Sequence, residues 1–158
     1  MVRAPVIAVI GAGNAAADVV ELAHEAGREI ASRGAVLICG GRGGVMEAAA
    51  RGVRERGGHA LGILPGYESN AANPFIEFAV ATGMGEARNV IVVASADAVI
   101  ALPGEGGTLA EIGFALKLGR PLVALGSWPQ IEGLYRADNA QAAVTMALEL
   151  AGYSERRG

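Results

Sequence analysis

Two hydrophobic patterns alternate along this chain of 158 residues. One is a short run of aliphatic, often β-branched residues, which is typical of a strand buried on both faces of a sheet. The other repeats apolar residues every three or four positions, with charged residues between them, and predicts a helix. Runs of the first kind predict strands over residues 6–10, 35–39, 60–64, 97–102 and 121–125, and an alternating pattern predicts another strand over residues 75–81.

The helical pattern falls between these predicted strands. We expect the side chain of Asn14 to cap the first helix and Gly34 to end it. A polar loop is expected over residues 65–74. Further helices are predicted over residues 45–56, 84–96, 108–118 and 139–151.

Strands that alternate with helices through short connections are typical of parallel βαβ units. The sequence therefore predicts an α/β fold, a Rossmann-like doubly wound sheet that is mostly parallel and has helices on both faces. We expect a single domain over residues 1–152 that binds a nucleotide or another phosphate, followed by a frayed tail over residues 153–158.

Three glycine-rich turns each follow a predicted strand and precede a predicted helix. They contain Gly11 and Gly13, then the run GGRGG, then Gly104, Gly106 and Gly107. Glycine lets the backbone come close to a ligand, and the N–H groups at a helix start bind phosphate. In doubly wound sheets, ligands lie at the carboxyl ends of the strands. Three such turns predict one shared crevice, although any one alone would fit a tight turn without a ligand.

The first two turns differ in what they offer a ligand. The first, GAGNAA, lacks the third glycine of the dinucleotide fingerprint, and no acidic residue ends the second strand, so NAD binding is disfavoured. In the second turn, Arg42 either contacts a phosphate or a base, or is simply solvated. The glycines that would wrap the ligand there are Gly40, Gly41, Gly43 and Gly44.

The third turn belongs to the stretch PGEGGTLAE, residues 103–111. Pro103 ends the strand, and a helix starting at Thr108 would direct its positive dipole end and a hydroxyl toward a phosphate. Two readings of Glu111 stay open. Its spacing from Thr108 matches a capping box, in which the carboxylate bonds to the backbone, but a carboxylate at this place could also act on a ligand. Arg88, at the start of another helix, is either a ligand contact or half of a surface ion pair with Glu86 or Glu111.

Composition and charge restrict the partners. The net charge is −3 and no block of Lys or Arg occurs, so a nucleic-acid surface is not expected. The single cysteine, Cys39, excludes an intrachain disulfide and a cysteine-rich metal site. No apolar run is long enough to span a bilayer. We therefore expect a cytoplasmic protein with a small phosphorylated ligand, no metal, and neither nucleic acid nor membrane as partner.

The glycine motifs are similar to those of a known superfamily. GGRGGVME followed by PGEGGTLAE resembles the LONELY GUY phosphoribohydrolases, often labelled lysine decarboxylase-like, and the related molybdenum-cofactor carrier proteins. The similarity runs from about residue 6 to residue 125. It implies a Rossmann-like sheet, usually a homodimer, and neither NAD nor pyridoxal phosphate.

The resemblance also implies roles for particular residues. In the hydrolases the PGG-x-GT-x-x-E motif binds the nucleotide 5′-phosphate, and its glutamate, here Glu111, assists cleavage of the bond between base and ribose. The second key residue matches Arg88, sixteen residues before Gly104. The chain departs from that pattern at Glu105, where the enzymes carry glycine, and at Asn89, where they carry lysine; its GGRGG turn is also shorter and closer to that of the carriers.

Three functions remain open on this basis. The first is a hydrolase that releases the base and ribose 5-phosphate from a nucleoside 5′-monophosphate, without a metal. The second is a carrier that holds a molybdopterin-like or nucleotide phosphate without turnover, in which Glu111 would be only a cap. The third, a purely structural module, is disfavoured by the concentration of glycines.

Overall fold

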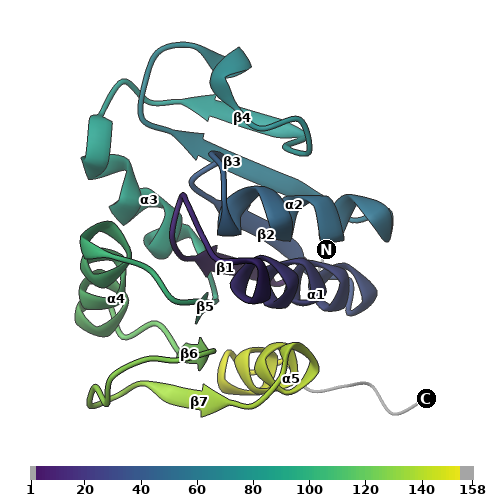
Figure 1. The fold of residues 1–158 in the computed structure, drawn as a ribbon, viewed down its shortest axis with the longest axis vertical. Coiled ribbons are helices and arrows are strands. Elements are labelled where there is room, and N and C mark those ends of the chain that lie inside the picture. The colour runs from purple at the N-terminus through teal and green to yellow at the C-terminus, as the bar shows by residue number, and fades with distance from the viewer. Residues whose placement is uncertain (1–2, 154–158) are drawn as a thin grey trace.

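The computed structural model describes residues 3–153 of the chain, and within them strands and helices alternate (Figure 1). The strands are β1 (Val6–Ile10), β2 (Val36–Cys39), β3 (Ala60–Leu64), β4 (Phe78–Ala81), β5 (Ala98–Ala101), β6 (Leu122–Leu125) and β7 (Tyr135–Ala137). The helices are α1 (Ala17–Ser32), α2 (Val45–Glu55), α3 (Arg88–Ser95), α4 (Gly106–Lys117) and α5 (Ala140–Leu150), with short 3-10 turns η1 (Ser69–Ala71) and η2 (Gly85–Ala87).

The strands of the described chain form one sheet in the order β4-β3-β2-β1-β5-β6-β7, and every neighbouring pair is parallel. The chain moves outward from β1 to β4 and then returns to add β5 on the other side of β1. The order of strands therefore reverses between β1 and β5. This arrangement confirms the predicted Rossmann-like doubly wound fold.

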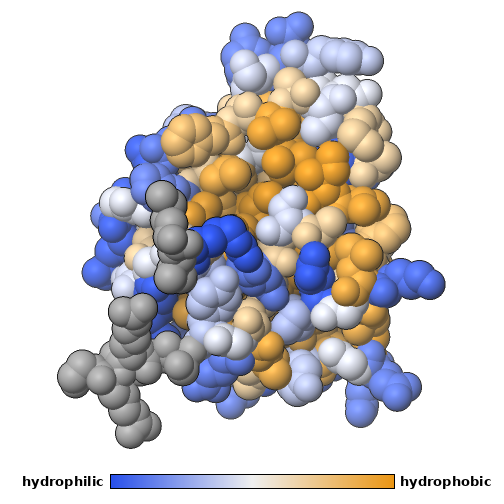
Figure 2. All heavy atoms as spheres, turned by 180° about the vertical axis from the view of Figure 1, so that it is seen from behind, coloured by the Kyte–Doolittle hydropathy of each residue, from blue (hydrophilic) through white to orange (hydrophobic). Residues whose placement is uncertain are grey.

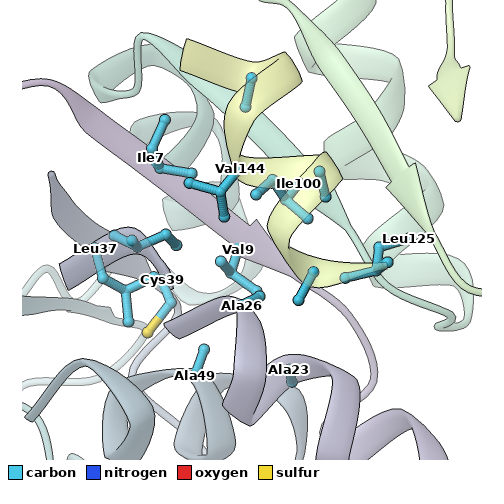
Figure 3. Close-up of a cluster of buried hydrophobic side chains, with 14 of the residues drawn as sticks. Ile7, Val9, Ala23, Ala26, Leu37, Cys39, Ala49, Ile100, Leu125 and Val144 are labelled. Carbon is cyan, nitrogen blue, oxygen red and sulfur yellow. The ribbon is translucent and has the colours of Figure 1, made fainter. Parts of the chain in front are cut away.

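Alternate residues of each strand enter the two layers of helices. Figure 1 shows α1, α2 and α5 on one side of the sheet and α3 and α4 on the other. Ile7 and Val9 of β1 pack in the first layer, and Ala8 and Ile10 pack in the second. Figure 3 shows Val9 in the first layer, between Ala26 of α1 and the side chains of β2. Cys39 belongs to this core, is fully buried and forms no disulfide. Burial raises the pKa of its thiol to about 11, so it is an inert thiol.

Helices α1 and α2 pack closely because each contributes a glycine at the contact. A methyl group added at Gly27 would overlap the carbonyl oxygen of Ala49, and one added at Gly52 would overlap that of His24. The ring of His24, 8% exposed, lies at the same contact and its Nε2 is 2.8 Å from the Glu55 carboxylate.

Several predicted boundaries needed correction. Asn14 does not cap α1, because the helix begins only at Ala17 and Ala16, with an extended backbone, takes the N-cap position without a side-chain bond. Gly34 does end α1 as predicted, with φ +71° and its N–H bonded to Ala31. The predicted fourth strand begins only at Phe78, because the N–H of Ile76 turns back to the carbonyl of Asn73.

Two further features lie in the C-terminal part of the chain, namely β7 and the tail. Strand β7 was not predicted, because its three residues include only one that is not exposed and lack an apolar run. The predicted frayed tail lies outside the described residues except for Tyr153, whose N–H bonds to the carbonyl of Leu148. Among the helices of residues 3–153, none has the length and apolar character needed to cross a bilayer.

Candidate functional site

A cavity of about 270 Å³ opens at the carboxyl ends of β1 and β5, where the strand order reverses. This is the position at which doubly wound sheets bind ligands. Its volume is near the lower end of the usual range for small-molecule sites, roughly 300–1,000 Å³. The cavity is lined by Val9, Ile10, Gly11, Ala12, Gly13, Asn14, Gly40, Met46, Glu86, Arg88, Asn89, Glu105, Gly107, Thr108 and Glu111.

The three glycine-rich turns meet at Ala12. Its N–H donates to the carbonyl of Pro103 at 3.1 Å, and its carbonyl accepts from the N–H of Val45 at 3.0 Å. The backbone of one residue in the first turn is thus bonded to the third turn and to the helix that follows the second. These bonds hold the turns around a single opening.

Glycine is required where the turns approach one another. At Gly44, φ is +62°, and a methyl group there would overlap the carbonyl oxygen of Ala12. A methyl group at Gly104 would overlap the hydroxyl of Thr108, and one at Gly40 would overlap the guanidinium of Arg88. These glycines leave room for the loop contacts and for two of the predicted site side chains.

The structure separates the predicted site residues into two groups. Gly11, Gly13, Gly40 and Gly107 line the cavity together with Arg88, Thr108 and Glu111. The remaining ones do not line it and support the turns from outside: Gly41, Arg42, Gly43, Gly44, Pro103, Gly104 and Gly106. Arg42 is exposed, and its backbone carbonyl accepts a bond of 2.8 Å from the side chain of Asn73.

Arg88 is the first residue of α3 and is only 7% exposed. Its Nη1 donates to the carbonyl of Gly40 and, at 2.7 Å, to that of Ile63. Burial lowers the pKa of Arg88, while Glu111 and Glu86 act in the opposite direction. The expected alternative of a surface ion pair is therefore wrong. Its Nε is buried and donates to no group of the described chain, so the guanidinium keeps a donor for an anion.

The helix that carries Thr108 begins earlier than predicted. Helix α4 starts at Gly106, and its N-cap is Glu105, whose side chain accepts no bond from the helix. Thr108 is the third helical residue, 4% exposed, so it does not occupy the N-cap of a capping box with Glu111. Two glycines at the first helical positions hid this start, because glycine is expected to precede a helix rather than to open it.

Glu111 lies one turn into α4, on the same face as Thr108. Its carboxylate takes part in none of the hydrogen bonds found within residues 3–153. Burial raises its pKa to about 7, Arg88 partly opposes this shift, and Glu86 adds to it. A carboxyl group that titrates near neutral pH and has no structural partner is suited to proton transfer.

Some lining residues were not singled out from the sequence. Asn14, Met46 and Asn89 were overlooked as ligand contacts, and Glu86 was considered only as an ion-pair partner. No local motif marks them, because the fold brings them together from three separate segments: the first glycine turn, α2, and the start of α3 with η2. Glu105, noted only as a departure from the family pattern, also lines the cavity. Within residues 3–153, no three His, Cys, Asp or Glu side chains are grouped so that they could hold a metal ion.

Fold and site together define a Rossmann-like protein whose ligand cavity lies at the reversal of strand order, with glycine turns and a helix N-terminus beside a buried arginine and a glutamate. Comparison with known families matches the SLOG cluster4 family over residues 4–151. The chain belongs to this family.

Two relatives with similar sequences are an uncharacterized protein and a hydrolase. The chain is 42% identical to an uncharacterized protein of Archaeoglobus fulgidus over 142 residues, covering 90% of this chain and 93% of the relative. It is 35% identical to the cytokinin riboside 5′-monophosphate phosphoribohydrolase of Mycobacterium tuberculosis over 128 residues, which cover 75% of this chain and 68% of that relative.

Solved structures add the carriers. The molybdenum cofactor binding protein of Rippkaea orientalis superposes with a TM-score of 0.88 at 31% identity, and the molybdenum cofactor carrier protein of Chlamydomonas reinhardtii with 0.88 at 32%. In each case 95% of this chain and 99% of the other are covered. The predicted superfamily, which contains both hydrolases and carriers, is thereby confirmed.

Proposed function

We propose that the chain binds a nucleoside 5′-monophosphate in this cavity and hydrolyses the bond between its base and its ribose. The observation that carries the proposal is the state of Glu111, which is free of any capping role, lies in the cavity near Arg88 and has a pKa of about 7. The hydrolase of Mycobacterium tuberculosis, 35% identical, supports the same reaction class.

The phosphate would lie at the N-terminus of α4. The first N–H groups of a helix have no partner within it, and the helix dipole is positive there. Gly107 and Thr108 border the cavity at this point, and Gly11 and Gly13 border it from the opposite turn. In this arrangement Gly104, Pro103 and the second glycine turn act indirectly, by shaping the loops.

Glu111 and Arg88 would carry the chemistry. As the bond from C1′ to the base nitrogen breaks, positive charge develops on the ribose, and an ionised Glu111 stabilises it. The oxygen of a water molecule then bonds to C1′, Glu111 accepts a proton from that water, and the same proton passes from Glu111 to the leaving base, which regenerates the carboxylate. The products are free base and ribose 5-phosphate. Arg88 would bind the ligand through the donor that its two carbonyl partners leave unused.

A carrier function is the second candidate, and two observations favour it. The cofactor-binding proteins of Rippkaea and Chlamydomonas superpose over almost the whole chain. Glu105 also places a carboxylate at the cavity beside the start of α4, where the hydrolase motif has glycine. A carrier would hold a phosphorylated ligand in the same cavity and leave its bonds intact. In both functions we expect a homo-oligomer in the cytoplasm, with no resident cofactor.

The two functions are separated by measuring release of ribose 5-phosphate from a panel of nucleoside 5′-monophosphates. For a hydrolase, Glu111→Gln should lower kcat by about 100-fold or more, the usual contribution of a general acid or base, without lowering the melting temperature. Unchanged turnover in a folded Glu111→Gln protein would contradict the role of Glu111. If no nucleotide is hydrolysed but nucleotides or pterin phosphates raise the melting temperature, the carrier function is supported instead.

A further inference from the structure

The end of the cavity formed by the start of α3 contains a group of polar side chains away from the proposed phosphate position. Glu86 lies in the η2 turn, and Arg88 and Asn89 open α3. Gly40 and Met46 border the same cavity from the second glycine turn and α2. Because the phosphate is assigned to the start of α4, this end of the cavity is left for the ring of the ligand.

Asn89 holds Glu86 in place. The side chain of Asn89 is buried, 6% exposed, and its Nδ2 donates to Glu86 Oε2 at 3.4 Å. Glu86 forms no ion pair with Arg88, whose Nη1 is bonded to two backbone carbonyls. Most of the acceptor capacity of the Glu86 carboxylate is therefore available at the cavity. Glu86 raises the pKa of Glu111 and opposes the lowering of that of Arg88, so it acts electrostatically on both proposed catalytic groups.

The available groups form a pattern of acceptors beside donors. An ionised carboxylate accepts hydrogen bonds through two neighbouring oxygens and donates none, whereas a guanidinium only donates. Guanine presents N1–H and a 2-amino group as adjacent donors, next to the O6 acceptor. Adenine presents an acceptor, N1, beside its 6-amino donor. A carboxylate facing this edge would therefore bond to the amino group but would be repelled by the lone pair of N1. Glu86 and Arg88, which line the same cavity, together therefore match a guanine edge and not an adenine edge.

We propose that Glu86, positioned by Asn89, determines the specificity of the site and selects a ring with a 2-amino-4-oxopyrimidine edge, as in guanine or a pterin, over adenine. The carboxylate accepts from N1–H and the 2-amino group, or from their equivalents in a pterin, and Arg88 donates to the neighbouring oxygen. The thioether of the half-buried Met46 packs on the ring. This inference rests on the proposed function, because it takes the same cavity as the binding site.

The first test compares kcat/KM for GMP, IMP and AMP. IMP lacks the 2-amino group but keeps the oxygen, so it reports on the bond to that amino group. Each well-formed pair of bonds to a base edge contributes about 1–3 kcal/mol of discrimination, so GMP should exceed AMP by about 10- to 100-fold, with IMP between them. Glu86→Gln replaces one acceptor by a donor and should bring the ratio of GMP to AMP close to one, with little change in melting temperature.

Glu105→Gln is the matched control, since it removes a carboxylate from the same cavity at its other end. It should change the rates for GMP and AMP by the same factor. A preference for AMP, or an unchanged ratio in a folded Glu86→Gln protein, would overturn the inference while leaving the proposed hydrolysis intact. If Glu86 only stabilised the start of α3, its loss would lower the melting temperature and leave the ratio unchanged.

Calorimetric titration with GMP, AMP and a pterin monophosphate keeps the inference testable if no nucleotide is hydrolysed. Tighter binding of GMP than of AMP, lost in Glu86→Gln, would support the edge selection although the hydrolase proposal had failed. Tighter binding of the pterin phosphate than of GMP would identify the pterin as the source of that edge. Equal binding of GMP and AMP, or binding of none of the three, would overturn the inference.

Discussion

The two faces of the sheet are built in different ways. On one face, α1, α2 and α5 cover a continuous core (Figure 3), and α1 meets α2 through glycines that bring the helix backbones together. On the other face, α3 and α4 cover the middle of the sheet, and their first turns line the cavity together with the glycine turns. The comparison shows that close helix packing is concentrated on one face, whereas the candidate catalytic residues Arg88 and Glu111 lie on the helices of the other.

The second face also leaves apolar side chains exposed. Figure 2 shows an apolar area on this side of the molecule, over α3 and the neighbouring edge of the sheet. Phe78 and Val80 are 54% and 47% exposed, and they pair in register with Leu61 and Ile63, whose side chains pack on this face. Strand β4 therefore extends the sheet beyond the helices that cover it.

The largest expected effect on stability is at the α1–α2 contact. In Gly52→Ala the new methyl group would overlap the carbonyl oxygen of His24, and we expect a loss of about 3 kcal/mol in the free energy of unfolding, as for severe overpacking. Gly113→Ala is the matched control, because Gly113 also lies inside a helix but is exposed, with nothing within 4 Å of the added atom. Without strain, the same change should stabilise by about 0.5–1 kcal/mol. Urea denaturation of both variants tests the comparison, and equal effects would contradict it.

A smaller effect is expected from pH at Glu111, on the opposite face. Its pKa is about 7 in the folded protein and 4.5 ordinarily, so between these values the folded state binds more protons than the unfolded state. The contribution of Glu111 to the free energy of unfolding must then fall as the pH rises from about 4.5 to 7, and stay low above that range. Since one pKa unit corresponds to about 1.4 kcal/mol, we expect a loss of about 1–3 kcal/mol.

Glu111→Gln removes this contribution. Unfolding free energies of both proteins should be measured from pH 5 to pH 8, and the difference between them isolates Glu111 from every other titrating group. The Gln variant should gain stability relative to the wild type as the pH rises. Parallel profiles would show that the pKa of Glu111 is not raised.

The smallest effect on stability is expected at the apolar surface of β4. Val80→Lys should change the free energy of unfolding by less than about 0.5 kcal/mol, as is usual for an exposed side chain. If a second copy of the chain covers this face, sedimentation velocity should show the assembly dissociating in the variant. Leu150→Lys, at a side chain 38% exposed on α5, serves as the control and should leave the assembly unchanged. Dissociation in both variants, or in neither, would argue against this face as the contact.

The sequence predicted the fold well because the central strands β1, β2, β3, β5 and β6 are buried on both faces and appear as uninterrupted apolar runs. It failed at β7, which lies at an edge of the described sheet and needs no such run. The site was predicted in part. The glycine turns, Arg88 and Glu111 stand out locally, and the structure brings them to one cavity.

Burial was harder to predict than position. Arg88 can be buried because its guanidinium donates hydrogen bonds to the carbonyls of Gly40 and Ile63. These two residues lie 48 and 25 positions away in the chain. Glu111 has no capping role because α4 starts at Gly106 and not after Thr108. The spacing of Thr108 and Glu111, three residues apart, suggests the later start and so conceals the true one. Distant backbone partners and the start of a helix are properties of the folded chain, and local spacing does not reveal them.

The backbone of Ala12 joins the first turn to Pro103 on one side and to Val45 on the other. None of the three turns can therefore swing outward alone without breaking a hydrogen bond. The cavity is preorganised, so a ligand that enters it loses little affinity to the ordering of loops. Because these bonds use only main-chain atoms, the side chain at position 12 can change without uncoupling the turns.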